Sequence, residues 1–182
     1  MTLTASSPAP LTLTLDPVLD PGLVDGVLSL WADVTNAGGA VGFVPPVTPD
    51  DIRPALDTHL TAIAAGRTRL LVARDGDGAV AATAFLVPSP HRLMRHHLWL
   101  YTVMVHPRHQ GKGYGRALMS AAEEAARGFE GVEALRLTCR GGTGADSFYA
   151  ACGYQEVGRI PGAIRVAPGD DRDDIHMMLP LR

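Results

Sequence analysis

The stretch VHPRHQGKGYGRAL, residues 105–118, places a proline, three glycines and several basic side chains directly before a segment of helical periodicity. We expect a strand to end at the proline and a helix to begin at Gly113. The first backbone N–H groups of a helix have no partner within it and point outward. Glycines at 111, 113 and 115 leave these donors uncovered, so the stretch predicts a site for a phosphate group.

Two other phosphate-binding motifs rich in glycine do not fit this segment. The dinucleotide motif G-x-G-x-x-G places its third glycine one residue later than GKGYG does, and it opens a strand–helix–strand unit. The P-loop has a hydroxyl residue after its lysine, whereas Gly113 follows Lys112. The pattern therefore disfavours both a Rossmann-type dinucleotide site and nucleotide hydrolysis.

Composition indicates one α/β domain. The chain has 182 residues, of which 46% are hydrophobic and 19% are charged. Residues 1–10 are rich in Thr, Ser and Pro, which is typical of a disordered tail, and residues 11–182 form the predicted domain. No apolar run reaches the roughly 20 residues of a membrane span, and the first residues lack the order of a secretion signal. We therefore expect a cytoplasmic protein with no membrane partner.

The charged residues are unevenly distributed. The formal net charge is -3, which gives the chain no electrostatic reason to bind nucleic acid. Residues 91–116 nevertheless hold four Arg, one Lys and five of the seven His, with no Asp or Glu. A bound polyanion explains this segment better than a solvated basic surface does. The two cysteines, Cys139 and Cys152, lack metal-ligand spacing, and we expect no metal.

Periodicity and turn residues predict the element order β-α-α-β-β-β-α-β-α-β-β. The expected strands cover residues 11–15, 69–74, 79–87, 97–105, 133–139, 154–160 and 175–181. Helices are expected at 21–34, from a cap at Asp50 or Asp51 to about residue 65, at 113–127 and at 143–152. The sequence DGDG, residues 75–78, is the strongest hairpin signal, and PGDDRDD, residues 168–174, is expected to form a turn within a long connection, 161–174.

The quoted stretch resembles the signature of the GNAT superfamily of N-acetyltransferases. The family pattern is R/Q-x-x-G-x-G/A after a V-x-V-x-P lead-in. A second segment, SFYAACGYQEVG at residues 147–158, resembles the family's characteristic ending, and the element order fits from about residue 11 to 180. The matching residues are Gln110, Gly113 and Gly115 in the signature and Val103, Val105 and Pro107 in the lead-in.

The resemblance implies an α/β fold with a mixed, mostly antiparallel sheet of about seven strands and about four flanking helices. The sheet splays between strands four and five, and the thioester of acetyl-CoA, the implied acetyl donor, lies in the gap. Lys112, Arg116 or Arg108 would approach its phosphates. The implied cofactor-binding residues are Val103, Met104 and Val105 for the pantetheine and Gln110, Gly111, Lys112, Gly113, Tyr114, Gly115 and Arg116 for the diphosphate.

Acetyl transfer to an amine needs a neutral amine, a donor to the developing oxyanion and an acid for the departing thiolate. Tyr149 matches the family tyrosine that is the implied acid, and an amide near Met104 or Val105 would serve the oxyanion. Strands four and five hold no carboxylate, where many relatives have a base. His97 and Tyr101 are therefore candidates for this role, directly or through water, beside an amine already deprotonated in solution.

The segments GGAVGF, residues 38–43, and 148–163 resemble the GNAT branch that contains the tabtoxin-resistance acetyltransferase. This similarity implies a small-molecule amine as acceptor, such as an amino-acid-like metabolite or antibiotic. A protein or peptide acetyltransferase and an acyl-CoA-binding module without turnover stay open as alternatives, and so does a homodimer, since family members often dimerise. Where the family has an asparagine, seven residues before Tyr149, this chain has Gly142.

Overall fold

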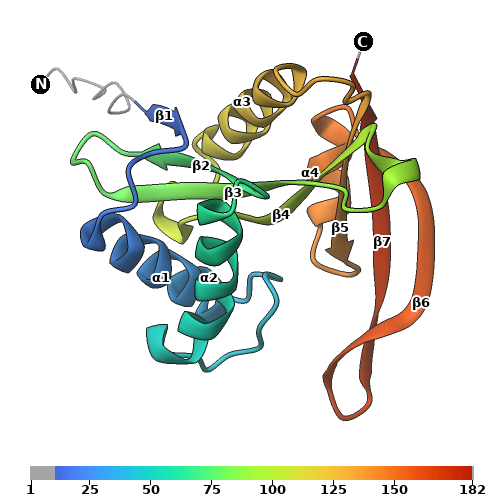
Figure 1. Ribbon diagram of the computed structural model, residues 1–182. Helices are drawn as coiled ribbons and strands as arrows, with labels where there is room; N and C mark the ends of the chain where they lie inside the picture. Colours follow the sequence, from blue (N-terminus) through green and yellow to red (C-terminus); the bar gives the residue numbers. More distant parts are fainter. Residues whose placement is uncertain (1–10, 182) are drawn as a thin grey trace, which may run out of the picture.

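The computed structural model describes residues 11–181 (Figure 1), so the tail predicted for residues 1–10 lies outside the described residues. The predicted element order is confirmed. The helices are α1 (Pro21–Asn36), α2 (Pro49–Ala64), α3 (Tyr114–Arg127) and α4 (Ala145–Ala151). The strands are β1 (Thr12–Leu15), β2 (Arg69–Arg74), β3 (Val80–Pro88), β4 (His97–Val105), β5 (Ala134–Arg140), β6 (Gln155–Ala167) and β7 (Asp170–Pro180).

The seven strands form one sheet in the order β1-β2-β3-β4-β5-β7-β6. All neighbours are antiparallel except β4 and β5, which run parallel. These two strands pair only from His97 opposite Ala134 to Trp99 opposite Arg136, and then separate. The predicted mixed sheet, splayed between its fourth and fifth strands, is confirmed.

A β-bulge lies in β4 just beyond the point where its pairing with β5 ends. Met104 pairs with Thr83 and Tyr101 with Phe85, so two residues of β4 face one residue of β3. The bulge residue Thr102 has a φ of 50°, in the left-handed region that side chains other than glycine rarely adopt. A bulge bends its strand and increases the local twist, which accounts for the divergence of β4 from β5.

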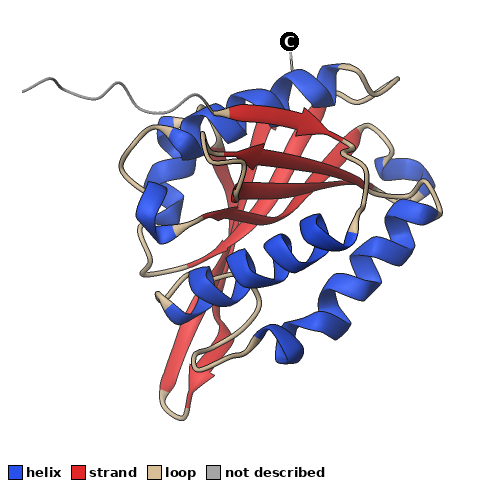
Figure 2. Ribbon diagram, turned by 90° about the vertical axis from the view of Figure 1, so that its left-hand side faces the viewer, coloured by secondary structure: helices blue, strands red, loops and turns tan. Residues whose placement is uncertain are grey.

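Helices cover both faces of the sheet (Figure 1; Figure 2). Helices α1 and α2 pack on one face, where Phe85 and Met104 are buried with the apolar side of α1. Helices α3 and α4 pack on the other, and Leu118, Ala122 and Ala126 of α3 are fully buried there. The core under α1 and α2 includes strand residues of β2, β3 and β4, whereas the core under α3 and α4 also includes residues of β5 and β7.

The predicted cap of α2 is wrong. The helix begins at Pro49, a favoured first helical residue, and its N-cap is Thr48 instead of Asp50 or Asp51. The Thr48 hydroxyl accepts from the Asp51 amide at 3.4 Å, and the Asp51 carboxylate accepts from the Thr48 amide at 2.7 Å. Asp51 thus completes a capping box three residues into the helix, and its hydrogen bonds from Thr48 lower the pKa of its carboxyl.

The predicted acidic turn at residues 168–174 is wrong in its extent, because the turn covers only Pro168 and Gly169 and β7 already begins at Asp170. The expected long connection is instead a ribbon in which β6 and β7 extend away from the rest of the sheet (Figure 1). Ion pairs along it, including Arg165 with Asp171 and Arg159 with Asp173, neutralise the acidic run. The charges that suggest a solvated turn therefore stabilise an exposed two-stranded ribbon.

Candidate functional site

A cleft of about 1160 Å³ opens where β4 and β5 separate. Its walls come from the α1–α2 connection, the outer half of β4, the loop before α3, the end of β5, the start of α4 and the β6–β7 ribbon. Most of the residues predicted to bind the cofactor line it. They are Val103, Val105, Gln110, Gly111, Gly113, Gly115 and Arg116.

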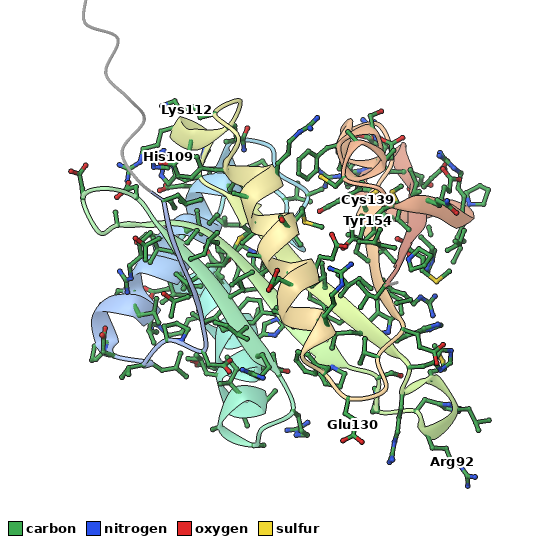
Figure 3. The ribbon with its side chains drawn as sticks, turned by 90° about the horizontal axis from the view of Figure 1, so that it is seen from above. Arg92, His109, Lys112, Glu130, Cys139 and Tyr154 are labelled. Carbon is green, nitrogen blue, oxygen red and sulfur yellow. The ribbon has the colours of Figure 1, made fainter. Side chains whose placement is uncertain are left out.

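Three predicted residues do not line the cleft with their side chains. Met104 is buried in the core under α1, on the opposite face of the sheet. Lys112 lies at the outer edge of the loop, beside His109 (Figure 3). Tyr114 is buried and stacks on the His109 ring with 4.6 Å between ring centroids. The contribution of these three residues to the cleft is limited to their backbone atoms.

The amides of residues 111–116 have no hydrogen-bond acceptor within the described chain; the first intrahelical bond of α3 runs from the Ala117 amide to the Gly113 carbonyl, at 3.0 Å. Gly111 and Gly113 have φ values of 73° and 86°, and a Cβ on either would meet nothing within 4 Å. A Cβ on Gly115 would lie 3.0 Å from the Phe148 ring. Free donors beside open space are what a diphosphate requires, so these residues fit the phosphates of acetyl-CoA.

The β2–β3 hairpin braces this loop through Asp75, whose side chain is 6% exposed. One carboxylate oxygen accepts from the amides of Asp77 at 3.1 Å and Ala79 at 3.0 Å. The other lies 2.8 Å from Arg108 Nη2 and 3.0 Å from His109 Nε2. Burial raises the pKa of the Asp75 carboxyl. The hydrogen bonds from Ala79, His109 and Asp77 and the charge of Arg108 together lower it by more, so the pKa of Asp75 lies below the ordinary value.

The hairpin signal DGDG therefore has a second role that the sequence did not reveal. Asp75 fixes His109, and His109 stacks at an interplanar angle of 6° on Tyr114, the first residue of α3. The same carboxylate forms an ion pair with Arg108, a residue that the sequence suggested as a phosphate ligand. Within the described chain, Lys112 and Arg116 have no carboxylate within 4.0 Å, and Arg116 lines the cleft.

Tyr149, the predicted acid, projects from α4 into the cleft and is 8% exposed. Burial raises the pKa of its phenol well above the ordinary value, and the neighbouring thiols of Cys139 and Cys152 raise it further. The phenol therefore keeps its proton at neutral pH. Cys139 also lines the cleft, and burial raises the pKa of its thiol to about 11. This part of the cleft is thus a poor environment for a thiolate.

The two candidates for the base lie at different distances from the cleft. Tyr101 lines it, 43% exposed, with its ring stacked on Trp99. Burial raises the pKa of the Tyr101 phenol, and the Arg136 charge partly offsets this. His97 stands at the closed end of the β4–β5 pair and is not among the cleft residues; burial lowers the pKa of its imidazole, and His96 and Arg136 lower it further. Tyr101 and Tyr149 therefore line the same cleft, and His97 lies outside it.

Gln110, the first residue of the signature, holds the loop to the end of β4. Its Nε2 donates to the Val105 carbonyl at 3.1 Å. The substitution of the family asparagine by Gly142 also has a structural counterpart. Gly142 has a φ of 76°, and a Cβ there would lie 2.5 Å from Arg172 Nη1. A side chain at this position would require Arg172 to move.

The cleft also contains Trp31 and Arg140, which the sequence did not single out, beside the loop 37–44 and Asp174 of the acidic cluster. The Trp31 indole donates to the Val41 carbonyl at 2.7 Å and so fixes the loop 37–44 against the cleft. Arg140 at the end of β5 and Asp174 on β7 are direct cross-strand partners, and both line the cleft. Asp174 belonged to the expected turn. Only its position in β7 shows that its side chain lies on the side of the sheet that lines the cleft.

No group of three or more His, Cys, Asp or Glu side chains among residues 11–181 is arranged to hold a metal ion. None of the helices described is long and apolar enough to span a membrane.

Comparison with known proteins identifies relatives of the same architecture. The family model of the GNAT acetyltransferases matches residues 42–154. A mycothiol acetyltransferase of Thermomonospora curvata is 37% identical over 79 residues, which are 43% of this chain and 25% of that protein. The chain thus spans only a quarter of this curated relative.

Solved structures match over nearly the whole chain. One, assigned as a phosphinothricin N-acetyltransferase, has a TM-score of 0.75 at 21% identity and covers 95% of this chain and 99% of its own. The acetyltransferase yncA of Salmonella typhimurium, solved with its cofactor acetyl-CoA, has a TM-score of 0.75 at 20% identity, with 96% and 95% covered. At these identities the two structures establish the fold.

Proposed function

Because the chain belongs to the GNAT family of acetyltransferases, we propose that it transfers the acetyl group of acetyl-CoA to the primary amine of a small, amino-acid-like molecule. One observation carries this proposal. The unpartnered amides of residues 111–116 open into the same cleft as the buried phenol of Tyr149. An anion cradle and a proton donor in one cleft suit a substrate that is phosphorylated at one end and releases a thiolate at the other.

In this proposal the loop and β4 align the donor substrate. The amides of residues 111–116 hold the diphosphate, and Arg116 adds a positive charge beside them. Val103 and Val105, on the strand that has left β5, present their backbone to the pantetheine arm. Acetyl-CoA supplies the activated acyl group as a thioester. The splay of β4 from β5 gives the thioester a place between the two strands.

Tyr149 acts as the acid in the transfer step. The amine nitrogen forms a bond to the acetyl carbon, the carbon–sulfur bond breaks, and Tyr149 gives its proton to the departing sulfur. The proton lost by the amine goes to solvent, directly or by way of Tyr101. The raised pKa of the Tyr149 phenol keeps its proton in place at neutral pH until the sulfur departs, as an acid in this step must.

The lining of the cleft favours a small acceptor. The loop 37–44 and residues 164–166 of the ribbon both line it and so limit the room beside β4 and β5. The names of two relatives, a mycothiol acetyltransferase and a phosphinothricin N-acetyltransferase, also refer to small molecules. A peptide acceptor would need a groove that continues past these segments.

Release of coenzyme A thiol, measured with a panel of amino acids, polyamines, other amines and peptides, tests the proposal. We expect release with small amines at rates well above the acceptor-free background. Turnover of peptides alone would favour a protein acetyltransferase. Saturable acetyl-CoA binding without thiol release across the panel would favour the acyl-CoA-binding module.

A further inference from the structure

The aspartates of the β6–β7 ribbon differ in their partners. Asp170, Asp171 and Asp173 each form an ion pair with an arginine of the ribbon. Asp174 does not, although Arg140 is its direct cross-strand partner on β5. Its carboxylate lies instead 3.3 Å from the His176 imidazole. Asp174 is also the one aspartate of the ribbon that lines the cleft.

Arg140 likewise forms no ion pair with residues 11–181. No Asp or Glu side chain of residues 11–181 lies within 4.0 Å of its guanidinium. The guanidinium lies instead beside the Gly38 carbonyl, at 3.5 Å from Nη2. Two opposite charges on neighbouring strands thus face the same cleft without neutralising each other.

The separation of the Asp174 and Arg140 charges forgoes the stabilisation of an ion pair, unless a ligand pairs with both charges. Two adjacent side chains of opposite charge on a sheet gain energy by pairing, and the rest of the ribbon does pair in this way. The Asp174 side chain is only 25% exposed, so water solvates it incompletely and an ion there interacts more strongly than at the surface. Separated, partly shielded charges of both signs fit a ligand that carries both signs itself.

We propose that Asp174 and Arg140 form the recognition site for a zwitterionic acceptor, an inference that rests on the proposed acetyl transfer. Asp174, held by His176, binds the ammonium group of the acceptor, which then loses one proton to solvent, directly or by way of Tyr101, so that the neutral amine attacks the acetyl carbon. Arg140 binds a carboxylate or a similar oxyanion that lies a few bonds away in the acceptor. A planar guanidinium suits this part, since it binds a carboxylate through two parallel hydrogen bonds. The acceptor class is therefore a free amino acid or a close analogue with an intact acid group.

Matched acceptors test this inference. Initial rates of thiol release are measured for the proteinogenic amino acids and phosphinothricin, and for the carboxamide and the decarboxylated amine of each turned-over amino acid. For the native protein we expect kcat/KM to be about 10- to 100-fold higher for the acid than for its amide, the range of one charged hydrogen bond. Arg140→Gln should remove this preference by raising KM for the acid, with the amide unaffected.

Asp174→Asn should lower kcat/KM for all amines alike, because it removes the partner of the ammonium group. Arg159→Gln and Asp173→Asn are the matched controls, since both residues lie on the same ribbon and neither lines the cleft. We expect the controls to keep the native preference. Thermal unfolding and acetyl-CoA affinity, measured for every variant, separate a local loss of recognition from misfolding.

Three results contradict the inference, and they differ in what else they contradict. Equal kcat/KM for acids, amides and simple amines in the native protein overturns the zwitterion site and leaves the acetyltransferase proposal standing. An Arg140→Gln variant that loses acids and amides equally does the same. Binding of acetyl-CoA without thiol release to any acceptor overturns both proposals.

Discussion

Replacement of Tyr149 by Phe separates a catalytic phenol from a core tyrosine. The change removes one oxygen from a side chain that is 8% exposed and whose hydroxyl forms no hydrogen bond with residues 11–181. No buried partner is left unsatisfied, so we expect the free energy of unfolding to change by less than about 1 kcal/mol, or about 2–4 °C in Tm for a chain of this length. The Phe variant should therefore fold and unfold much like the native protein.

Turnover should respond very differently. A positioned acid contributes about 10²- to 10⁴-fold to a rate, so the Phe variant should lose at least about 10²-fold in kcat, or about 2.7 kcal/mol of transition-state stabilisation. The affinity for acetyl-CoA should stay within about twofold, since the proposed diphosphate cradle is residues 111–116 and does not include Tyr149. The assays are steady-state thiol release and calorimetric titration with acetyl-CoA.

Tyr154 provides the matched control. Its ring centroid lies 5.9 Å from that of Tyr149, and its buried hydroxyl lacks a hydrogen-bond partner in the described chain. It does not line the main cleft. Tyr154→Phe should therefore keep native turnover and unfold at the same temperature or higher. Equal kcat values for the two variants, or equal losses of rate and of acetyl-CoA affinity in the Tyr149 variant, would refute the role of Tyr149 as acid.

The remaining predictions concern the scaffold and its response to pH. Asp75→Asn should lower the free energy of unfolding by about 2 kcal/mol and should weaken acetyl-CoA binding. The expected loss is smaller than for a fully buried ion pair because the Arg108 side chain is 53% exposed. Differential scanning calorimetry measures the first effect and titration with acetyl-CoA the second. The pKa of Asp75 is lower in the folded state, so its contribution is present above about pH 4 and is lost as the pH falls further, and the stability difference between native protein and variant should shrink there. Thr48→Ala should lower Tm by about 2–4 °C through loss of the capping box, with unchanged turnover. The raised pKa of Tyr149 predicts that kcat does not fall through ionisation of this phenol up to about pH 10, and a loss of activity below pH 9 that the Tyr149→Phe variant lacks would contradict the assignment.

Local patterns predicted the fold well because they coincide with the tertiary contacts. The alternation and length of HLWLYTVMV match β4, and the apolar spacing of Leu118, Ala122 and Ala126 matches the buried side of α3. Thr48 was missed because Thr48, Asp50 and Asp51 can each cap a helix, and the reciprocal bond between Thr48 and Asp51 decides between them. The ribbon was missed because its charges pair across strands, a property that no single segment displays.

The site residues also differ in whether a single segment of the sequence could predict them. The diphosphate loop is one continuous segment, so its glycines and free amides could be predicted from residues 110–116. The proposed acceptor site combines a loop after α1, the end of β5 and the middle of β7, and only the register of the sheet places Arg140 opposite Asp174. Asp75 lies 33 residues before its partner Arg108, and composition gave no sign that a hairpin turn would brace the loop.

The central claim is that the amides of residues 111–116 hold the diphosphate of the donor substrate. Titration of ¹⁵N-labelled protein with coenzyme A, followed by amide NMR, tests it residue by residue. We expect the amide signals of this loop, those of Gly111, Gly113 and Gly115 above all, to shift downfield in proportion to occupancy, and ADP, which carries the same diphosphate, to shift them in the same direction. Saturating coenzyme A that shifts other signals and leaves these amides in place would contradict the claim.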